Sequence, residues 1–268
     1  MKDLLHPSHH ATLARFAGRD GEAPVLLAFD YDGVLAPLVK KPGGATMRRR
    51  TRALLVRLSR LYPVAVVSGR AWKDTRRLSE GVVPHVVGNH GFELLRPLPV
   101  PRQTLRAVRG WRRRLEADLA GVPGLHFEDK RSTLAIHYGL SAAWRRAEKL
   151  VYAAANRLEG TRLVPGKKVL NVLPHDFPNK GDAIRTLLAR LGLAAALYAG
   201  DDVTDEDAFR LGSPLVLGVH VGAGPSLAPW RLDSQARVDD LLGRLVALRE
   251  PRPRAHPRAR RAGARRRR

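Results

Sequence analysis

Carboxylates gather in two short segments of this 268-residue sequence, in a spacing that suits acid–base and metal chemistry. In the first segment Asp30 and Asp32 flank one residue, so both side chains point the same way from an extended chain, and Gly33 permits a tight turn after them. The second segment contains Asp201, Asp202 and Asp205. Because neighbouring like charges repel strongly, the two segments can converge only around a cation, and Mg²⁺ prefers such oxygen ligands. The pattern therefore predicts Mg²⁺-assisted phosphoryl transfer, with one Asp attacking phosphorus and the second handling the proton.

Ser68 and Lys180 have the chemistry to hold the phosphate. Lys180 falls in the first turn of a helix that begins after Asn179. A cation at this end of a helix is unfavourable because of the helix dipole, so this lysine is stabilised there if an anion lies nearby. Each feature also has a plain structural reading. The Asp-x-Asp-Gly segment could be a turn, and Ser68 and the segment 204–207 could be helix caps. Taken together and in this order, the residues favour a catalytic site.

Five short apolar runs predict the strands of a parallel sheet buried on both faces. The runs are Val25–Phe29, Val64–Val67, Val86–Val87, Ala194–Ala199 and Leu215–Val219. Helical stripes alternate with them over Thr46–Leu61, Asn179–Leu191 and Ala236–Leu248. Strands that alternate with helices predict a doubly wound α/β core.

Polar residues follow four of these five runs. They are Asp30 to Gly33, Ser68 to Arg70, Gly88 to Gly91 and Gly200 to Asp202. Ligands of open parallel sheets bind outside the carboxyl ends of the strands. Four segments that deliver polar groups to one edge therefore predict an active site there.

The stretch 99–174 has a different pattern. Two helices, over Arg102–Ala120 and Ser141–Leu158, alternate with pairs of half-exposed strands. The strand pairs are Leu125–Lys130 with Ser132–Tyr138, and Arg162–Val164 with Lys168–Leu173. This αββαββ order predicts a cap (lid) domain at 99–174 inserted into a discontinuous core made of 1–98 and 175–248.

Net charge and composition limit the class of protein. The formal charge is +23, and the ten Arg and one Glu of residues 249–268 contribute +9 of it. This tail should be disordered and could make weak contact with nucleic acid. Absence of cysteine excludes disulfides, thiolate zinc sites and a cysteine nucleophile. With no apolar run near the ~18 residues of a membrane span and no signal peptide, we expect a cytoplasmic monomer without membrane contact. The first residues, with His6, His9 and His10, should be frayed.

Four segments resemble the motifs of haloacid-dehalogenase-type phosphatases. They are Leu27 to Pro37, Ser68-Gly69-Arg70, Lys180, and Gly200 to Phe209. The last string, GDDVTDEDAF, resembles the trehalose-6-phosphate phosphatase family more than the superfamily at large. Further support comes from GNHG at 88–91, EDK at 128–130, HY at 137–138 and GKK at 166–168. The similarity covers roughly Val25 to Val246.

The resemblance implies a role for each matching residue. Asp30 would be the nucleophile that forms an aspartyl-phosphate, and Asp32 the general acid/base whose carbonyl also binds Mg²⁺. Asp201 would be the third protein ligand of the metal, with Asp205 in or just behind the metal shell. Phosphate would contact Ser68, Gly69 and Lys180. The sugar would contact Arg70, Asn89, His90, Glu128, Lys130 and Asn171.

The sequence departs from the family pattern at three cap positions. The strand that usually reads Glu-x-Arg-Pro is here Asn171-Val172-Leu173-Pro174, and Gly139 stands where Arg usually follows the His-Tyr pair. We therefore expect hydrolysis of trehalose 6-phosphate, with another sugar phosphate as the alternative substrate. A second alternative, from a different class, is a nucleic-acid-binding protein with a vestigial phosphatase site. Against this alternative stand the intact site residues Asp30, Asp32, Ser68, Lys180 and Asp201.

Overall fold

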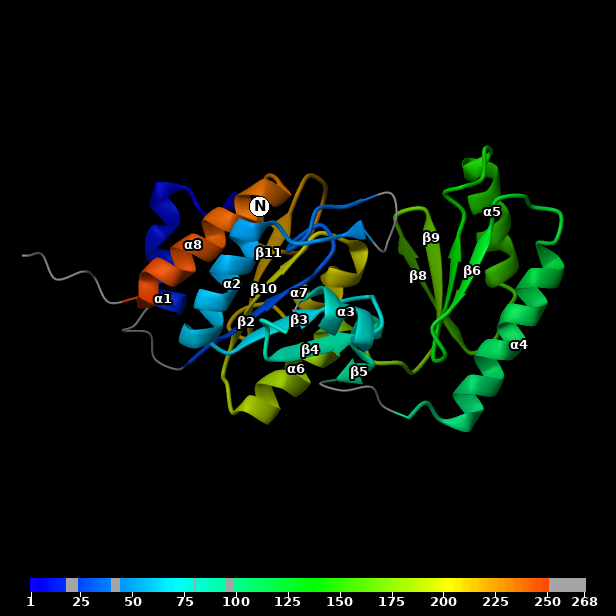
Figure 1. Cartoon of the computed structure of the whole chain (residues 1–268), viewed down its shortest axis with the longest axis horizontal. Coiled ribbons are helices and arrows are strands. Elements are labelled where there is room, and N and C mark those ends of the chain that lie inside the picture. The colour runs from blue at the N-terminus through cyan, green and yellow to red at the C-terminus, as the bar shows by residue number, and fades with distance from the viewer. Residues whose placement is uncertain (18–23, 40–43, 80, 95–98, 251–268) are drawn as a thin grey trace, which may run out of the picture.

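The computed structural model describes residues 1–17, 24–39, 44–79, 81–94 and 99–250. It contains two β-sheets, each with its own helices (Figure 1). The larger sheet belongs to the core, which the N-terminal and C-terminal parts of the chain build together. The smaller sheet belongs to the segment between them, which we call the cap (residues 102–174). The expected disordered tail lies outside the described residues, apart from Arg249 and Glu250.

The core sheet has eight strands in the order β1-β12-β11-β10-β2-β3-β4-β5. All neighbours run parallel except β4 and β5. The strands are β1 Lys2–Asp3, β2 Leu26–Phe29, β3 Val64–Val67, β4 His85–Gly88, β5 Glu93–Leu94, β10 Ala196–Gly200, β11 Val216–Val221 and β12 Trp230–Leu232. Ala199 of β10 and Val66 of β3 both pair with Phe29 of β2, so these three strands end side by side.

Both faces of this sheet are covered by helices, because successive side chains of a strand point to opposite faces. Leu27 and Phe29 pack toward α1 (His10–Ala17), α2 (Arg49–Leu61) and α8 (Val238–Arg249). Leu26 and Ala28 pack toward α6 (Lys180–Leu191) and α7 (Glu206–Phe209). The short helix α3 (Trp72–Leu78) contacts β4. The unbroken apolar runs of the sequence thus reflect burial on both sides.

The cap folds in the order αββαββ around a four-stranded antiparallel sheet, β6-β7-β9-β8. Its elements are α4 Arg102–Asp118, β6 His126–Asp129, β7 Leu134–His137, α5 Trp144–Ala155, β8 Thr161–Gly166 and β9 Val169–Pro174. One face of the sheet packs on α4 and α5 through residues that include Leu134, Leu170 and Val172. The doubly wound core with an αββαββ cap confirms the predicted fold class. The domain boundaries at 98/99 and 174/175 remain a prediction.

The N-terminus is the part of the fold that sequence reasoning described wrongly. It is not frayed: β1 pairs with β12, and Leu4 and Leu13 are 0 % and 1 % exposed in the core. His9 Nδ1 donates to the carbonyl oxygen of Asp3 at 2.7 Å, and the His9 ring packs edge-on against Trp230. None of the helices in the described part of the chain is long and apolar enough to span a membrane.

Candidate active site

Asp30 lies at the carboxyl end of β2, in the middle of the core sheet, and is 6 % exposed. Its amide N–H donates to the carbonyl of Ala199 on β10, which extends the strand pairing by one residue. The amide of Tyr31 donates to Asp30 Oδ1 at 2.7 Å. Gly33 follows with φ +77°, and a Cβ there would collide with the Asp201 carboxylate. The turn after β2 therefore needs glycine both for its backbone conformation and for the close approach of β10.

Lys180 joins the two acidic segments. Its Nζ lies 3.0 Å from Asp30 Oδ2 and 2.6 Å from Asp205 Oδ1, and the residue is 2 % exposed. The position follows from helix capping, since the side chain of Asn179 accepts from the amide of Asp182 and makes Lys180 the first residue of α6. A buried ammonium group of this kind is stable only because it is paired with carboxylates.

The Asp205 carboxylate accepts four hydrogen bonds. Oδ1 accepts from Lys180 Nζ and from the Tyr198 hydroxyl at 2.5 Å, and Oδ2 accepts from the amides of Asp201 and Asp202, both at 2.9 Å. A Cβ on Gly200 would collide with this carboxylate, so the glycine makes room for it. With both oxygens engaged twice, Asp205 holds the strand end and Lys180 in place.

Burial and the neighbouring charges shift the pKa values of the residues in this cluster. It raises the pKa of Asp30 well above the usual value, with Asp205 and Asp201 adding to the rise and Lys180 opposing it. Burial, with the nearby Asp205, also raises the pKa of Asp201 to about 7. Burial lowers the pKa of Lys180, but Asp205 and Asp30 outweigh it and hold that pKa above its usual value. The carboxylates together carry more negative charge than Lys180 compensates.

The donor set fits Mg²⁺. One carboxylate oxygen each from Asp30, Asp201 and Asp205 lies within 4.8 Å of the others. Hard oxygen donors of this kind are the ligands that Mg²⁺ prefers. Burial and the neighbouring carboxylates raise the pKa values of Asp30 and Asp201, so a further positive charge beside them would be favourable. Each oxygen of Asp205 accepts two hydrogen bonds, whereas each oxygen of Asp30 has one such contact, so Asp205 has fewer lone pairs left for a metal than Asp30.

Adding Mg²⁺ to protein treated with EDTA should raise its melting temperature. A ligand that binds only the folded state stabilises it by about 2.7 kcal/mol at a hundredfold excess over Kd. Asp201→Asn should remove most of this shift, while Asp176→Asn, at a fully exposed carboxylate, should keep it. Differential scanning fluorimetry at increasing Mg²⁺ measures the effect. An unchanged melting temperature in the parent, or a full shift in Asp201→Asn, would contradict the assignment.

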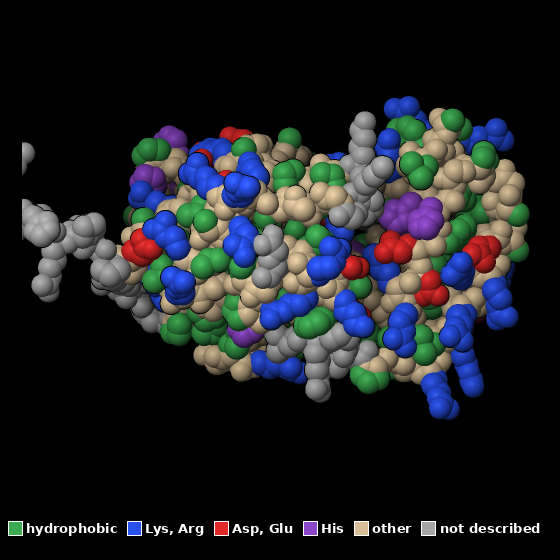
Figure 2. Space-filling view, viewed as in Figure 1, with side chains coloured by type: hydrophobic (Ala, Val, Ile, Leu, Met, Phe, Trp, Pro, Cys, Tyr) green, Lys and Arg blue, Asp and Glu red, His purple; other side chains and the backbone are tan. Residues whose placement is uncertain are grey.

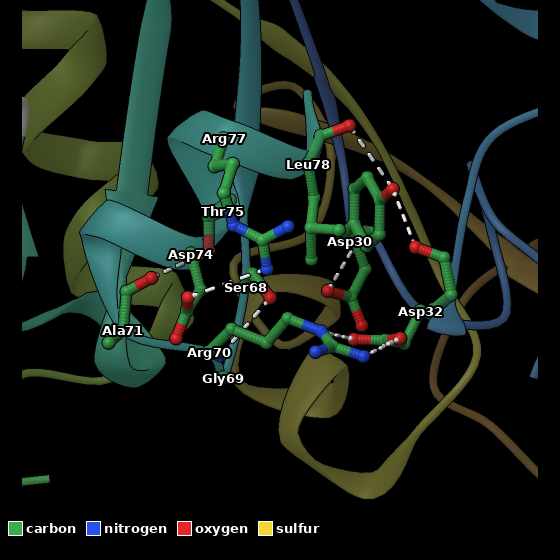
Figure 3. Close-up of polar contacts among 12 residues, drawn as sticks. Asp30, Asp32, Ser68, Gly69, Arg70, Ala71, Asp74, Thr75, Arg77 and Leu78 are labelled. Carbon is green, nitrogen blue, oxygen red and sulfur yellow. Dashed lines mark hydrogen bonds and ion pairs between the residues drawn. The ribbon is translucent and has the colours of Figure 1, made fainter. Parts of the chain in front are cut away.

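Asp32 is paired with Arg70 rather than with the buried cluster. Arg70 Nε lies 2.5 Å from Asp32 Oδ2, and Nη2 lies 2.7 Å from Oδ1 (Figure 3). Burial lowers the pKa of Arg70, but the contact with Asp32 outweighs it and raises the value. A bidentate pair fixes both the position and the plane of a carboxylate. Arg70 therefore orients Asp32 beside Asp30.

The loop after β3 is held from several sides. Ser68 is 1 % exposed, its amide donates to the carbonyl of Val87, and its Oγ accepts from the amide of Arg70 at 3.2 Å. The segment after β4 returns hydrogen bonds to this loop, from the Asn89 amide to the Arg70 carbonyl and from the His90 amide to the Ser68 carbonyl. Ser68 thus stands at the strand end next to Asp30, as its place after an apolar run predicted.

Asn89 connects the core to the cap. Its amide nitrogen donates to Ser132 Oγ at 2.5 Å, and its amide oxygen accepts from Thr133 Oγ1 at 2.9 Å. Asn89, Ser132 and Thr133 are all buried, and the two hydroxyls belong to the turn between β6 and β7. In this conformation both polar atoms of the Asn89 side chain are therefore engaged by the cap.

Glu128 and Lys130 lie near this same turn. Glu128 Oε2 is 2.9 Å from His137 Nε2, and this contact holds the pKa of Glu128 at about 2. Lys130 Nζ donates to the carbonyl of Gly69 at 3.3 Å, so the cap touches the loop that carries Ser68. Burial lowers the pKa of Lys130.

Asn171 lies on β9, 7 % exposed, with its amide nitrogen 3.3 Å from the carbonyl of Val164. Its neighbours Leu170 and Val172 face the helices of the cap, so Asn171 and Leu173 belong to the opposite face of the sheet. In the strand register Asn171 pairs with Ala135 and Val164, and Leu173 pairs with Arg162.

The structure places these predicted site residues in three groups, two in the core and one in the cap. Asp30, Lys180, Asp201 and Asp205 form one buried cluster, Asp32 and Arg70 form a pair beside it, and Glu128 and Lys130 belong to the cap. Sequence reasoning missed Tyr198 and Arg162. Tyr198 carries a hydroxyl within the apolar run of β10, three residues before Asp201, which was a usable signal. Arg162 had none, because only the register shows that it pairs with Leu173.

The parallel core sheet carries an Asp-x-Asp segment at the end of a middle strand. A lysine from a helix N-terminus and an acidic group from the adjacent strand lie beside this segment. This arrangement defines a haloacid-dehalogenase-like fold. The sequence profile described as Trehalose-phosphatase matches residues 28–236. The chain belongs to the trehalose-phosphatase family.

Curated relatives and solved structures agree with this placement. The "Trehalose-phosphate phosphatase" of Mycobacterium ulcerans is 33 % identical over 247 residues, which are 82 % of this chain and 60 % of the relative. The chain thus spans about 60 % of that relative's length. The C-terminal domain of Candida albicans trehalose-6-phosphate phosphatase has a TM-score of 0.76 at 21 % identity, covering 92 % and 98 % of the two chains. Aspergillus fumigatus trehalose-6-phosphate phosphatase has a TM-score of 0.62 at 25 % identity, covering 92 % and 99 %.

Proposed function

We propose that this chain is a Mg²⁺-dependent phosphatase that hydrolyses trehalose 6-phosphate to trehalose and phosphate. The observation that carries the proposal is the buried contact of Lys180 with Asp30 and Asp205, at the end of the strand where a phosphatase of this fold has its nucleophile. Membership of the trehalose-phosphatase family supports the choice of substrate.

Asp30 is the nucleophile in this proposal. One of its carboxylate oxygens bonds to phosphorus while the bond from phosphorus to the sugar oxygen breaks, which leaves an aspartyl-phosphate. Lys180 and Ser68 hold the phosphoryl oxygens, and Lys180 also keeps the Asp30 carboxylate in place. Asp30, Asp201 and the carbonyl of Asp32 would hold Mg²⁺, which offsets phosphoryl charge when bound.

Asp32 moves the proton in both steps. It gives a proton to the departing sugar oxygen, then takes one from the water that attacks phosphorus and releases Asp30. Arg70 positions Asp32 through the two-point contact, and the contact must loosen as Asp32 changes charge. The cap covers the site through Asn89 and Lys130, and Glu128 and Asn171 contact the sugar. Cap closure would also exclude bulk water.

A second candidate is a phosphatase of the same mechanism for another sugar phosphate. Asn171, Leu173 and Gly139 support it, since they replace a carboxylate and two arginines that this family usually carries. Phosphate release from trehalose 6-phosphate, sucrose 6-phosphate and glucose 6-phosphate, each with and without EDTA, decides between the two. We expect the highest kcat/KM for trehalose 6-phosphate and loss of turnover with EDTA. A higher value for another sugar phosphate would reject the substrate, and turnover that survives EDTA would reject the Mg²⁺ requirement.

Asn171→Glu should lower KM for trehalose 6-phosphate by up to about tenfold. A carboxylate that accepts from a sugar hydroxyl contributes roughly 1.5–3 kcal/mol against about 1 for an amide, and 1.4 kcal/mol is a factor of ten. Asn171→Gln matches the size of Glu without its charge and serves as the control. Equal KM values in the two variants would show that charge at this position does not bind the sugar.

The remaining proposals concern partners and location. We propose that the chain acts as a cytoplasmic protein and as a monomer. The mechanism above needs no second subunit, which supports the monomer. Weak contact with nucleic acid is proposed for the arginine-rich residues 249–268, which carry a charge of +9. On the face drawn in Figure 2, Lys and Arg side chains are spread over core and cap rather than gathered into one patch.

A further inference from the structure

A small cavity lies between strand β8 of the cap and the core, with a volume of about 10 Å³. Its lining includes His90, Arg162, Val164, Lys180 and Thr204. A cavity of this volume holds about one water molecule or one hydroxyl group. We call this cavity the recess. Because Lys180 also contacts Asp30, the recess lies directly beside the proposed reaction centre.

Within the described part of the chain, three buried nitrogens at the recess find no hydrogen-bond partner. They are Nδ1 and Nε2 of His90 and Nε of Arg162. His90 is only 8 % exposed, so water at the surface does not satisfy its ring. Buried polar atoms of native proteins are paired in the great majority of cases, and exceptions mark a bound water, an ion or a functional role. Arg162 Nη2 donates to the carbonyl of Pro178, so its Nε and the His90 ring are the groups still without a partner, and both residues line the recess. They therefore point to a ligand atom at this place.

The His90 side chain is held in place by an unusual backbone. Asn89, His90 and Gly91 have φ values of 51°, 58° and 118° in succession. A Cβ on Gly91 would collide with the carbonyl of Asn179, and the His90 amide donates to the Ser68 carbonyl. Non-glycine residues in this conformation persist only where the surroundings fix them, and they concentrate at ligand sites.

Charge favours an oxygen ligand. Burial lowers the pKa of His90 well below its usual value, and Lys130, Lys180 and Arg162 lower it further, whereas the nearby side chain of Asn171 raises it without making a well-formed hydrogen bond to the ring. The ring is thus neutral, with one N–H donor and one acceptor nitrogen. Arg162 offers only donors. A hydroxyl oxygen can accept from Arg162 and donate to His90, which uses both kinds of group.

Strand geometry directs Arg162 to this place. Leu163 packs in the cap interior, so Arg162 and Val164 lie on the opposite face of β8, in register with Leu173 and Asn171. Arg162 and Val164 also line a larger cleft of about 630 Å³, which β8 forms with α7 and residues 225–227. The cleft offers space for the rest of a bulky leaving group.

We propose that the recess receives a hydroxyl oxygen of the sugar, and that Arg162 is a specificity-determining residue of this phosphatase. The inference rests on the proposed function, because the hydroxyl belongs to the sugar phosphate being hydrolysed. Arg162 Nε–H donates to the hydroxyl oxygen, and the hydroxyl donates to the acceptor nitrogen of His90. The phosphoryl group stays with Asp30, Ser68 and Lys180.

Arg162→Met tests the proposal through substrates with and without a sugar. We expect KM for trehalose 6-phosphate to rise about tenfold, the scale of one lost charge-assisted hydrogen bond, with kinetic constants for para-nitrophenyl phosphate unchanged. Arg114→Met is the matched control, since Arg114 is an exposed arginine of α4, a helix that covers the opposite face of the cap sheet, and it should leave both substrates unaffected. Arg162→Gln provides a second variant should the Met variant fail to fold.

A double-mutant cycle tests whether Arg162 and His90 share one ligand atom. Asn tolerates the left-handed backbone at position 90, so His90→Asn is the suitable variant. The effects of His90→Asn and Arg162→Met on KM for trehalose 6-phosphate should be less than additive. Full additivity would overturn the shared recess.

Three further results would separate the inference from the proposed function. An unchanged KM in Arg162→Met would overturn the inference. Equal losses on trehalose 6-phosphate and para-nitrophenyl phosphate, with weaker inhibition by inorganic phosphate, would overturn it by assigning the recess to a phosphoryl oxygen. If the parent hydrolyses a different sugar phosphate, the proposed function fails, and the same comparison with that sugar phosphate still decides the role of Arg162.

Discussion

Asp30→Asn should abolish phosphate release from trehalose 6-phosphate, with an expected loss on the order of 10⁴-fold or more, because the nucleophile is removed. The amide has the shape of the carboxylate but cannot attack phosphorus. Stability should not fall, because burial and neighbouring carboxylates hold the pKa of Asp30 high, which means that its negative charge is disfavoured in the folded state. Phosphate release and the melting temperature measure the two effects.

Asp240→Asn is the control for this result, because Asp240 is an exposed carboxylate on α8 far along the chain from the site motifs. It should leave both turnover and melting temperature unchanged. Turnover of Asp30→Asn within tenfold of the parent would show that another group attacks phosphorus.

Lys180→Met should abolish turnover and also destabilise the fold. Lys180 is 2 % exposed and contacts both Asp30 and Asp205, so its removal leaves two carboxylates buried without their cation. Breaking a buried ion pair by removing one partner costs roughly 3–5 kcal/mol. Urea denaturation gives the change in the free energy of unfolding.

The double variant Lys180→Met with Asp205→Asn tests the cause of this loss. Replacing the Asp205 carboxylate by an amide removes one uncompensated charge, so the double variant should be more stable than Lys180→Met alone, though still inactive. A double variant less stable than the single one would show that charge in the cluster does not account for the effect.

The core sheet, and the place of the site at the carboxyl ends of its strands, were predictable because the sequence patterns that indicate them are local. A parallel strand buried on both faces gives an unbroken apolar run, and β2, β3, β10 and β11 all match predicted runs within about two residues at their ends. Asp30 and Ser68 follow such runs, so their meeting at one edge needed only the parallel order of the strands. Lys180 was recognisable from its place after a capping Asn179.

The remaining features depend on contacts between segments that lie far apart in the chain. β1 has two residues, and it pairs with β12 near the other end of the chain, next to Leu4 in the core. The bidentate contact of Arg70 with Asp32 joins residues 38 positions apart, and Asn89 meets Ser132 across 43. Residue type predicted that these side chains were polar and near the site, but not which partner each would have.

The central claim is that Asp30 accepts the phosphoryl group of trehalose 6-phosphate. Rapid acid quenching during turnover of trehalose 6-phosphate with a labelled phosphoryl group tests it most directly, followed by proteolysis and mass spectrometry. The account predicts label on the peptide that contains Asp30, as an acyl phosphate that hydroxylamine removes, and no label in Asp30→Asn. Label on another residue, or release of phosphate with no labelled protein at any quench time, would contradict it.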